Sequence, residues 1–268
     1  MQPKPPTTEP TSAAILQVRG LSKSFRGLRA LEAYELDLHA RSIHGVIGPN
    51  GAGKTTLFHV LSGFLRPSAG TVVFDGLDIT GSPAWKVARL GIGRTFQNIR
   101  LFNDLSVVDN VKVAVQRQWR HSLSATLLST RGFRRREREI DAAAVELLDR
   151  VGLTARRDNL ARSLAYGDQR RLEIARAVAT NPRVLLLDEP NAGMNPIETQ
   201  DLLSLIRRLR DELGITIVLV AHDIPLVMNL CDRIQVLNYG RLIAEGDPAA
   251  VRANPDVIAA YLGQARSA

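Results

Sequence analysis

The segment Gly48-Pro49-Asn50-Gly51-Ala52-Gly53-Lys54-Thr55 constrains the fold of this chain more than any other. It matches the pattern G-x-x-x-x-G-K-[ST]. It lies between an apolar run that predicts a strand, Ile43–Ile47, and a helical pattern over Thr55–Leu65. Glycines let such a loop curl its N–H groups around phosphate oxygens, and the helix N-terminus adds its dipole. The sequence therefore predicts a phosphate-binding loop between a strand and a helix.

The loop residues have separate expected roles. Lys54 supplies a positive charge for the β- and γ-phosphates of a nucleotide, and the Thr55 hydroxyl is expected to bind Mg²⁺. The cofactors predicted here are ATP and Mg²⁺. The residues expected to bind them in this segment are Gly48, Pro49, Asn50, Gly51, Ala52, Gly53, Lys54, Thr55 and Thr56.

A second apolar strand ends in two acidic residues. Val184–Leu187 is a continuous apolar run, typical of a strand buried on both faces, and Asp188 and Glu189 follow it. A carboxylate at the C-terminal end of such a strand can bind Mg²⁺, which predicts Asp188 as a metal ligand. Glu189, one residue further, can act on an attacking water. The alternative is a structural strand that ends in acidic residues.

Composition limits the class of protein. The chain has 268 residues, 45% of them hydrophobic and 23% charged, which excludes a mostly disordered chain. No apolar run approaches the roughly 18–20 residues that span a bilayer. The net charge of +8 is compatible with nucleic acid, nucleotide or an anionic membrane surface. The single cysteine, Cys231, fits a reducing compartment.

Strand and helix patterns alternate along the chain. Ile15–Val18 alternates like an edge strand, and a long helical stretch follows between about residues 98 and 179. Further patterns predict a strand at Thr71–Phe74, a helix at Leu172–Ala179, a helix at Thr199–Leu213, a buried strand at Ile215–Val220 and a hairpin around Asn238-Tyr239-Gly240. This order predicts an α/β fold with a parallel core sheet and a helical insert.

Further motifs follow in a fixed order: Phe96-Gln97, Leu164-Ala165-Tyr166-Gly167-Asp168-Gln169-Arg170-Arg171, the acidic strand end, Asn191-Ala192-Gly193-Met194-Asn195, and Ala221-His222-Asp223. With them the chain resembles the nucleotide-binding subunit of ABC transporters over residues 15–262. The motifs are similar to that family's Q-loop, signature, Walker B, D-loop and H-switch. The resemblance implies a P-loop NTPase with a RecA-like core, an N-terminal antiparallel β region and an inserted α-helical subdomain.

Other segments resemble the LivG-type subunit of bacterial branched-chain amino acid importers. They are the Tyr166–Arg170 form of the signature, Arg94–Gln97 with Arg100–Phe102, and the ending Asn254–Ile258 with Ala260–Gly263. Related ATPases for urea, amide or lipopolysaccharide transport share several of these segments, and they stay as alternatives.

The resemblance implies roles for single residues. Two subunits close head to tail, so that Ala165, Tyr166, Gly167 and Asp168 bind the ATP of the facing subunit. Gln97 senses Mg²⁺ and the γ-phosphate, and His222 holds the attacking water with the catalytic base Glu189. Phe25 occupies the place of an aromatic that stacks on adenine; the alternative is a packed core phenylalanine. For Gln97 the alternative is a surface glutamine, and for His222 a capped strand end.

Two positions depart from the family pattern. Ala165 stands where the common signature has serine, so a hydroxyl toward the γ-phosphate is missing. Asn195 stands where many D-loops have aspartate, which affects coupling between subunits. A basic cluster at 131–138 has two interpretations, a solvated helix start or a contact with anionic lipid or a permease.

The resemblance thus implies an ATPase subunit that powers branched-chain amino acid import, held peripherally on the cytoplasmic face of a bacterial plasma membrane. The expected partners are integral-membrane permease subunits, a second ATPase subunit, and indirectly a periplasmic or extracellular solute-binding protein. The expected organisation is a disordered tail (1–14), one ATPase domain (15–262, helical subdomain about 98–179) and a C-terminal tail (263–268).

Two other classes are less consistent with the sequence. DNA repair and chromosome ATPases separate their two ATPase halves by long coiled coils, and this chain has no long heptad run. Translation-associated ATPases carry two cassettes, whereas this chain has one phosphate loop. Nucleic acid is therefore not an expected partner.

Overall fold

The computed structural model describes residues 14–117, 131–221 and 223–262. The predicted C-terminal tail and all but the last residue of the predicted N-terminal tail lie outside these ranges. The predicted helical subdomain is described apart from residues 118–130. Within the described ranges, the structure contains no helix with the length and apolarity that a membrane span requires.

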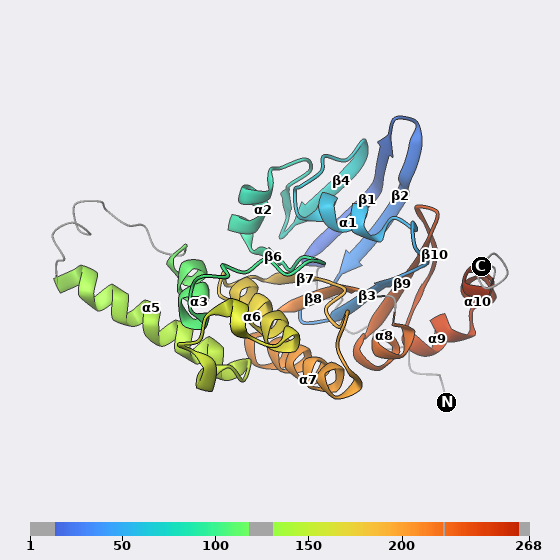
Figure 1. Cartoon of the computed structure of the whole chain (residues 1–268). Coiled ribbons are helices and arrows are strands. Elements are labelled where there is room, and N and C mark those ends of the chain that lie inside the picture. The colour runs from blue at the N-terminus through green and yellow to red at the C-terminus, as the bar shows by residue number, and fades with distance from the viewer. Residues whose placement is uncertain (1–13, 118–130, 222, 263–268) are drawn as a thin grey trace, which may run out of the picture.

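A six-stranded sheet forms the core (Figure 1). Its strands are, in spatial order, β10 (Arg241–Gly246), β9 (Arg233–Asn238), β3 (Ile43–Ile47), β8 (Thr216–Val220), β7 (Val184–Asp188) and β6 (Ile92–Arg94). Every neighbouring pair is parallel except β9 and β10, which form the predicted hairpin. The predicted α/β fold with a parallel core sheet is confirmed.

Both faces of this sheet are buried. Along β7, Leu185 and Leu187 pack into one hydrophobic cluster with the helices below the sheet, while Val184 and Leu186 pack into a second cluster with the N-terminal strands. Side chains of a strand alternate between its faces, so the continuous apolar run satisfies two cores at once. The core sheet therefore fixes the C-terminal ends of β3 and β7. The phosphate loop follows the end of β3, and Asp188 is the last residue of β7.

A second, antiparallel sheet lies above the core sheet in Figure 1. Its order is β2 (Leu28–Leu38), β1 (Leu16–Phe25), β4 (Ala69–Phe74) and β5 (Leu77–Asp78). The prediction of an edge strand at Ile15–Val18 is wrong, because Val18 of β1 pairs with Leu36 on one side and Val72 on the other. Alternation in sequence indicates that one face is buried, and it does not tell whether both edges are paired.

Helices surround the two sheets. The helix α1 (Lys54–Leu61) follows the phosphate loop, and α2 (Ala84–Leu90) precedes β6. The inserted region contains α3 (Val107–Gln116), α5 (Arg131–Arg150), the short η1 (Thr154–Arg156) and η2 (Ala161–Ser163), and α6 (Tyr166–Val178). The helices α7 (Pro196–Leu213), α8 (Ile224–Leu230), α9 (Pro248–Ala253) and α10 (Pro255–Leu262) complete the fold.

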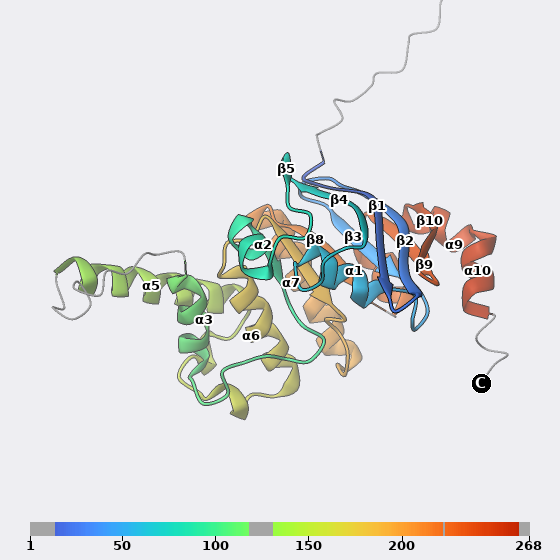
Figure 2. The same ribbon diagram turned by 90° about the horizontal axis from the view of Figure 1, so that it is seen from above.

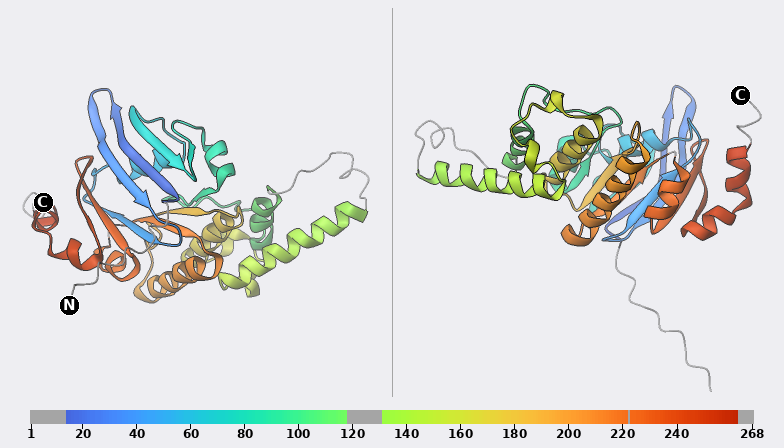
Figure 3. Two further views of the ribbon diagram at one scale, coloured as in Figure 1. Left: turned by 180° about the vertical axis from the view of Figure 1, so that it is seen from behind. Right: turned by 60° about the horizontal axis from the view of Figure 1, so that its bottom comes forward.

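Seen from above, α5 and α10 lie at opposite ends of the molecule (Figure 2). From behind, α9 and α10 lie beside the β9–β10 hairpin (Figure 3).

Two helices begin earlier than predicted. The helix α6 starts at Tyr166, so most of the signature segment is its first turn. The helix α7 starts at Pro196, because Asn195 caps it.

Candidate nucleotide site

The phosphate loop joins the end of β3 to the start of α1, as predicted. Two glycines are required by close backbone approach. A Cβ on Gly48 would clash with the carbonyl oxygen of Leu237, and one on Gly53 would clash with that of Ala30. Gly53 also has a φ of 105°, which strains any residue with a side chain. The β9–β10 hairpin on one side and β2 on the other therefore leave no room for side chains at these two positions of the loop.

Lys54 lies inside this curl. Its Nζ donates hydrogen bonds to the carbonyl oxygens of Gly48 and Pro49, at 2.6 and 2.9 Å, and the residue is 7% exposed. Burial lowers the pKa of Lys54, and the carboxylates of Glu189 and Asp188 act against that shift. In this structure the two carbonyl dipoles partly compensate the charge of the ammonium group. We expect phosphate oxygens to take over that role when a nucleotide binds.

One cavity joins the loop to the other half of the site. It has a volume of about 240 Å³ and is lined by Ala30, Asn50, Gly51, Ala52, Gly53, Lys54, Thr55, Thr56, Gln97 and Glu189. The amide Nε2 of Gln97 donates a hydrogen bond to Oε2 of Glu189 at 3.4 Å. The structure therefore brings together residues that lie far apart in the sequence, from β3–α1, the loop after β6 and the end of β7.

Glu189 has a strained backbone. Its φ is 44°, and its N–H donates to the carbonyl of Val220 at 2.9 Å. A non-glycine residue in the left-handed region costs about 1–3 kcal/mol and persists where surrounding structure fixes it, commonly at active sites. This left-handed conformation turns the chain sharply at Glu189. Asp188 is therefore buried in the strand, while Glu189 lines the cavity.

Asp188 forms an ion pair that was not predicted from the sequence. Arg94 Nη2 donates to its Oδ2 at 2.9 Å, and the two side chains are 5% and 4% exposed. Arg94 also donates to Ser62 Oγ at 2.9 Å and lies over the ring of Phe96. Burial lowers the pKa of Arg94, and Asp188 opposes that shift. The motif Arg94–Gln97 drew attention to this arginine, but only the pairing of β6 with β7 reveals its partner.

The donor set of the site fits Mg²⁺. The Asp188 carboxylate has a second oxygen beside the one that binds Arg94, and the cavity offers the Thr55 hydroxyl and the Gln97 amide oxygen. Among the described residues no group of three or more His, Cys, Asp or Glu could hold a metal. Mg²⁺ needs no such group, since nucleotide sites bind it through one or two carboxylates, phosphates and water.

The signature residues lie at the start of α6. Ala165 is the N-cap, and its methyl group makes no capping hydrogen bond. Asp168 pairs with Arg156 at 2.9 Å, and a Cβ on Gly167 would lie 3.0 Å from Oε1 of Glu198. None of Ala165, Tyr166, Gly167 and Asp168 is among the residues that line the phosphate-loop cavity. The signature segment therefore forms the start of α6, and within one chain it does not line the phosphate-loop cavity.

Three other predicted positions differ in outcome. Phe25, at the end of β1, is 42% exposed, so the alternative of a packed core phenylalanine is wrong. Its ring lies 5.1 Å from Lys23 Nζ and is open to further stacking. Asn195 accepts hydrogen bonds from the N–H groups of Ile197 and Glu198, both at 2.9 Å, as the N-cap of α7. His222 lies outside the described residues.

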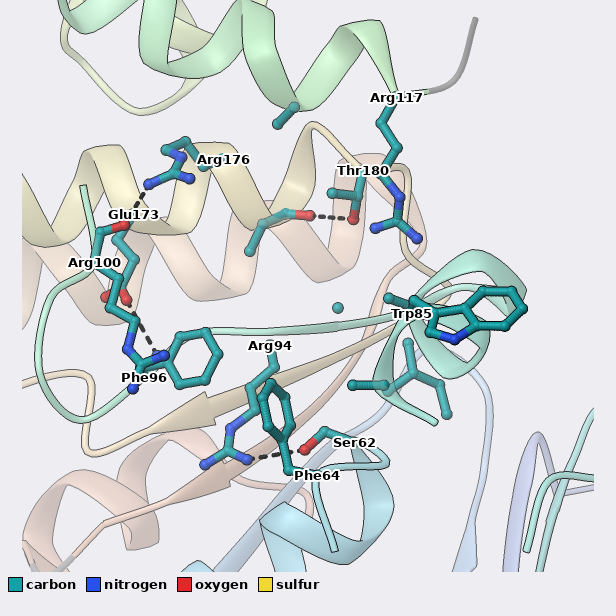
Figure 4. Close-up of a pocket in the computed structure, with 16 residues that line it drawn as sticks. Ser62, Phe64, Trp85, Arg94, Phe96, Arg100, Arg117, Glu173, Arg176 and Thr180 are labelled. Carbon is teal, nitrogen blue, oxygen red and sulfur yellow. Dashed lines mark hydrogen bonds between the residues drawn. The ribbon is translucent and has the colours of Figure 1, made fainter. Parts of the chain in front are cut away.

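A larger cavity, of about 450 Å³, lies where α2, β6, α3 and α6 meet (Figure 4). Aromatic rings of Phe64, Trp85 and Phe96 line it, and Trp85 is 64% exposed. Arginines 100, 117 and 176 add positive charge to the lining. This cavity is separate from the phosphate loop, and the two share no lining residue.

Comparisons with known proteins agree with this geometry. A family model described as ABC transporter matches residues 31–192, and one described as branched-chain amino acid ATP-binding cassette transporter matches residues 241–266. The chain is 48% identical over 254 residues to BraF of Pseudomonas aeruginosa, a high-affinity branched-chain amino acid transport ATP-binding protein, covering 95% of this chain and 100% of that protein.

LivG of Escherichia coli, which carries the same description, is 47% identical over the same shares of the two chains. Among solved structures, the ADP conformation of MJ1267, an ATP-binding cassette of an ABC transporter, has a TM-score of 0.81 at 29% identity. That likeness covers 94% of this chain and 100% of MJ1267.

Proposed function

This chain belongs to the ABC transporter family, as an ATPase subunit of the branched-chain amino acid type, and on that premise we propose what it energises and how. Its proposed role is to power the import of branched-chain amino acids through a membrane permease. The names of BraF and LivG and the match of residues 241–266 support this solute over urea, amides or lipopolysaccharide, which are the alternatives.

One observation carries the proposed chemistry. Lys54, Gln97 and Glu189 line a single cavity, and Asp188 ends the strand directly before Glu189. Lys54 and the loop N–H groups bind the phosphates, while Thr55, Asp188 and Gln97 are the proposed Mg²⁺ ligands, and Mg²⁺ supplies charge neutralisation at the phosphates. Glu189 accepts a proton from the attacking water, and Gln97 holds the Glu189 carboxylate by its amide.

The site is proposed to be completed by a second ATPase subunit. The start of α6 can aim N–H groups and a helix dipole at a phosphate, but it does so away from this chain's own loop cavity. A head-to-tail pair brings one subunit's α6 to the other's loop. Phe25, exposed at the end of β1, and His222 complete the proposed set at the adenine and the γ-phosphate.

The permease is proposed to bind at the larger cavity in Figure 4. Exposed aromatic groups and arginines suit a partner segment with apolar and acidic side chains. Such a contact would hold this chain peripherally on the cytoplasmic face of a bacterial plasma membrane. The solute-binding protein acts on the other side and does not contact this chain.

The test uses the purified complex of this chain with its membrane partners, reconstituted in vesicles. Glu189→Gln keeps the shape of the side chain and removes the proton acceptor, so ATP turnover and leucine uptake should fall by about 10²–10⁴-fold while ATP still binds. Glu146→Gln, on the exposed face of α5, is the control. Uptake of urea in place of leucine by the parent complex would overturn the proposed solute.

A further inference from the structure

Arg170 of α6 is a fully buried arginine, 0% exposed, beside the signature segment. Its guanidinium reaches out of the helix to the loop that follows β6. Nη1 donates to the carbonyl oxygen of Phe96 at 2.8 Å, and Nη2 donates to that of Gln97 at 3.0 Å. The planar group thus binds two successive carbonyls through two separate nitrogens held in a fixed fork, whereas a lysine has a single nitrogen.

Glu173, one turn further along α6, completes the contact. Its Oε2 accepts from Arg170 Nη1 at 2.7 Å, and its Oε1 accepts from the N–H of Phe96 at 3.1 Å. Burial raises the pKa of Glu173, and the charge of Arg170 opposes the shift. Two buried side chains of α6 therefore hold the N–H and the C=O of Phe96 and the C=O of Gln97.

The core sheet anchors this loop only up to its start. The strand β6 ends at Arg94, and the N–H of Thr95 donates to Leu186 of β7 at 2.9 Å. Beyond Thr95, the backbone of Phe96 and Gln97 is bound by α6 instead. The side chain of Gln97, in contrast, points to the core domain, where it binds Glu189 and lines the loop cavity.

We propose that Arg170, together with Glu173, is a positioning residue that fixes Gln97 to α6, so that Gln97 follows any displacement of the signature helix. The inference rests on the proposed role of Gln97 at the phosphate-loop site. Because Ala165–Asp168 begin the same helix, the clamp links the signature, which serves the facing subunit's ATP, to the glutamine that serves this chain's own ATP. One rigid helix then couples the two sites of the pair.

The choice of variants follows from the burial of the pair. Removing one partner alone would leave a buried charge without compensation and risks unfolding. Arg170→Lys keeps the charge but replaces the two fixed guanidinium nitrogens by one nitrogen on a shorter side chain, so the carbonyls of Phe96 and Gln97 and the Glu173 carboxylate lose their separate donors. The double variant Arg170→Gln/Glu173→Gln removes both charges together and serves as a second route if the lysine variant does not fold.

The experiment is a double-mutant cycle between Arg170 and Gln97 in the complete transporter. Arg170→Lys should lower kcat by about 10- to 100-fold, because small displacements of a positioned group have effects of this size. The affinity for ATP without Mg²⁺ should change less than about twofold, since Lys54 and the loop are untouched. In a Gln97→Ala background, Arg170→Lys should change kcat by less than about twofold. Amide exchange at Phe96 should accelerate while Tm is kept.

The matched control is Arg150→Lys. Arg150, at the end of α5, also joins the inserted helices to the core, because it pairs with Glu212 of α7 as well as with Glu146 of its own helix, but it does not touch the loop after β6. It should leave kcat and Phe96 exchange unchanged in both backgrounds. If the losses from Arg170→Lys and Gln97→Ala multiply, or if Phe96 exchange is unaltered, the positioning role is overturned. If Gln97→Ala alone leaves turnover intact, the proposed role of Gln97 fails first.

Discussion

At the scale of residues, the polar groups of the site are paired with other groups of the chain, some local and some from distant elements. Lys54 is held by carbonyls of its own loop, while Asp188 is paired with Arg94 and Gln97 with Glu189. Lys54 and the Arg94–Asp188 pair are buried, whereas the Gln97–Glu189 hydrogen bond is exposed, so the first two hold their side chains more tightly in one orientation.

Replacing Lys54 tests the centre of the loop. Lys54→Ala removes the cation that we propose to bind the phosphates, and a lost charge-assisted contact of about 1.5–3 kcal/mol corresponds to roughly 10- to 150-fold weaker ATP binding. Isothermal titration with ATP and Mg²⁺ measures it, with Lys86→Ala, an exposed lysine of α2, as the control. An unchanged dissociation constant would remove Lys54 from the phosphate site.

At the scale of elements, the two helices that follow the site motifs begin differently. The helix α7 has a capping box, in which Asn195 and Glu198 bond to each other's backbone, and Pro196 occupies its first turn. The helix α6 begins at Ala165 without any side-chain cap. The departure at Asn195 thus preserves a cap, whereas the departure at Ala165 leaves N–H groups at the start of α6 without one.

Ala165→Ser should act on both the helix and the facing ATP. A serine oxygen can accept from an N–H of the first turn, which stabilises a helix by about 0.5–2 kcal/mol, and Tm should rise by about 2–4 °C per kcal/mol. Its O–H remains a donor for a phosphate oxygen and should contribute roughly 0.5–1.5 kcal/mol to closure of the pair.

Thermal unfolding of the isolated chain measures the capping effect of Ala165→Ser. Chromatography with ATP, in the Glu189→Gln background and with the true partner subunit, measures closure of the pair. Asn195→Ala, which removes an existing cap, is the matched reverse change for stability. A serine that raises Tm and leaves closure unchanged would place the start of α6 away from the facing phosphate.

At the scale of the whole molecule, the chain presents two surfaces for which we propose different partners. The phosphate-loop cavity lacks donors from α6, and the larger cavity carries exposed aromatic and basic groups (Figure 4). The inserted helices connect them, since α6 contributes both most of the signature and Glu173, Arg176 and Ala177 of the larger cavity. Contact at one surface can therefore alter the other.

The isolated chain should be a poor ATPase at dilute concentration. Without the facing α6, the γ-phosphate loses preorganised donors, each of which is worth about 10²–10³ in rate in comparable sites. Turnover per subunit should rise at least about a hundredfold in the reconstituted transporter. Measuring turnover against protein concentration separates the cases, and a full rate that does not depend on concentration would contradict the composite site.

The sequence alone was enough to predict the nucleotide chemistry, because the motifs on which the prediction rests are local. The spacing from Gly48 to Thr55, the buried run before Asp188 and the order of the motifs each depend on neighbours in the chain. The parallel core sheet was predicted from continuous apolar runs, because a strand that is buried on both faces needs apolar side chains at every position.

Only the tertiary structure decided which distant groups meet. It set β1 inside its sheet, paired Arg94 with Asp188, and bound Arg170 to the carbonyls of Phe96 and Gln97. Periodicity records which face of an element is buried but not which element covers it. The partner of a buried charge is chosen when strands and helices pack, and desolvation then makes that choice costly to change.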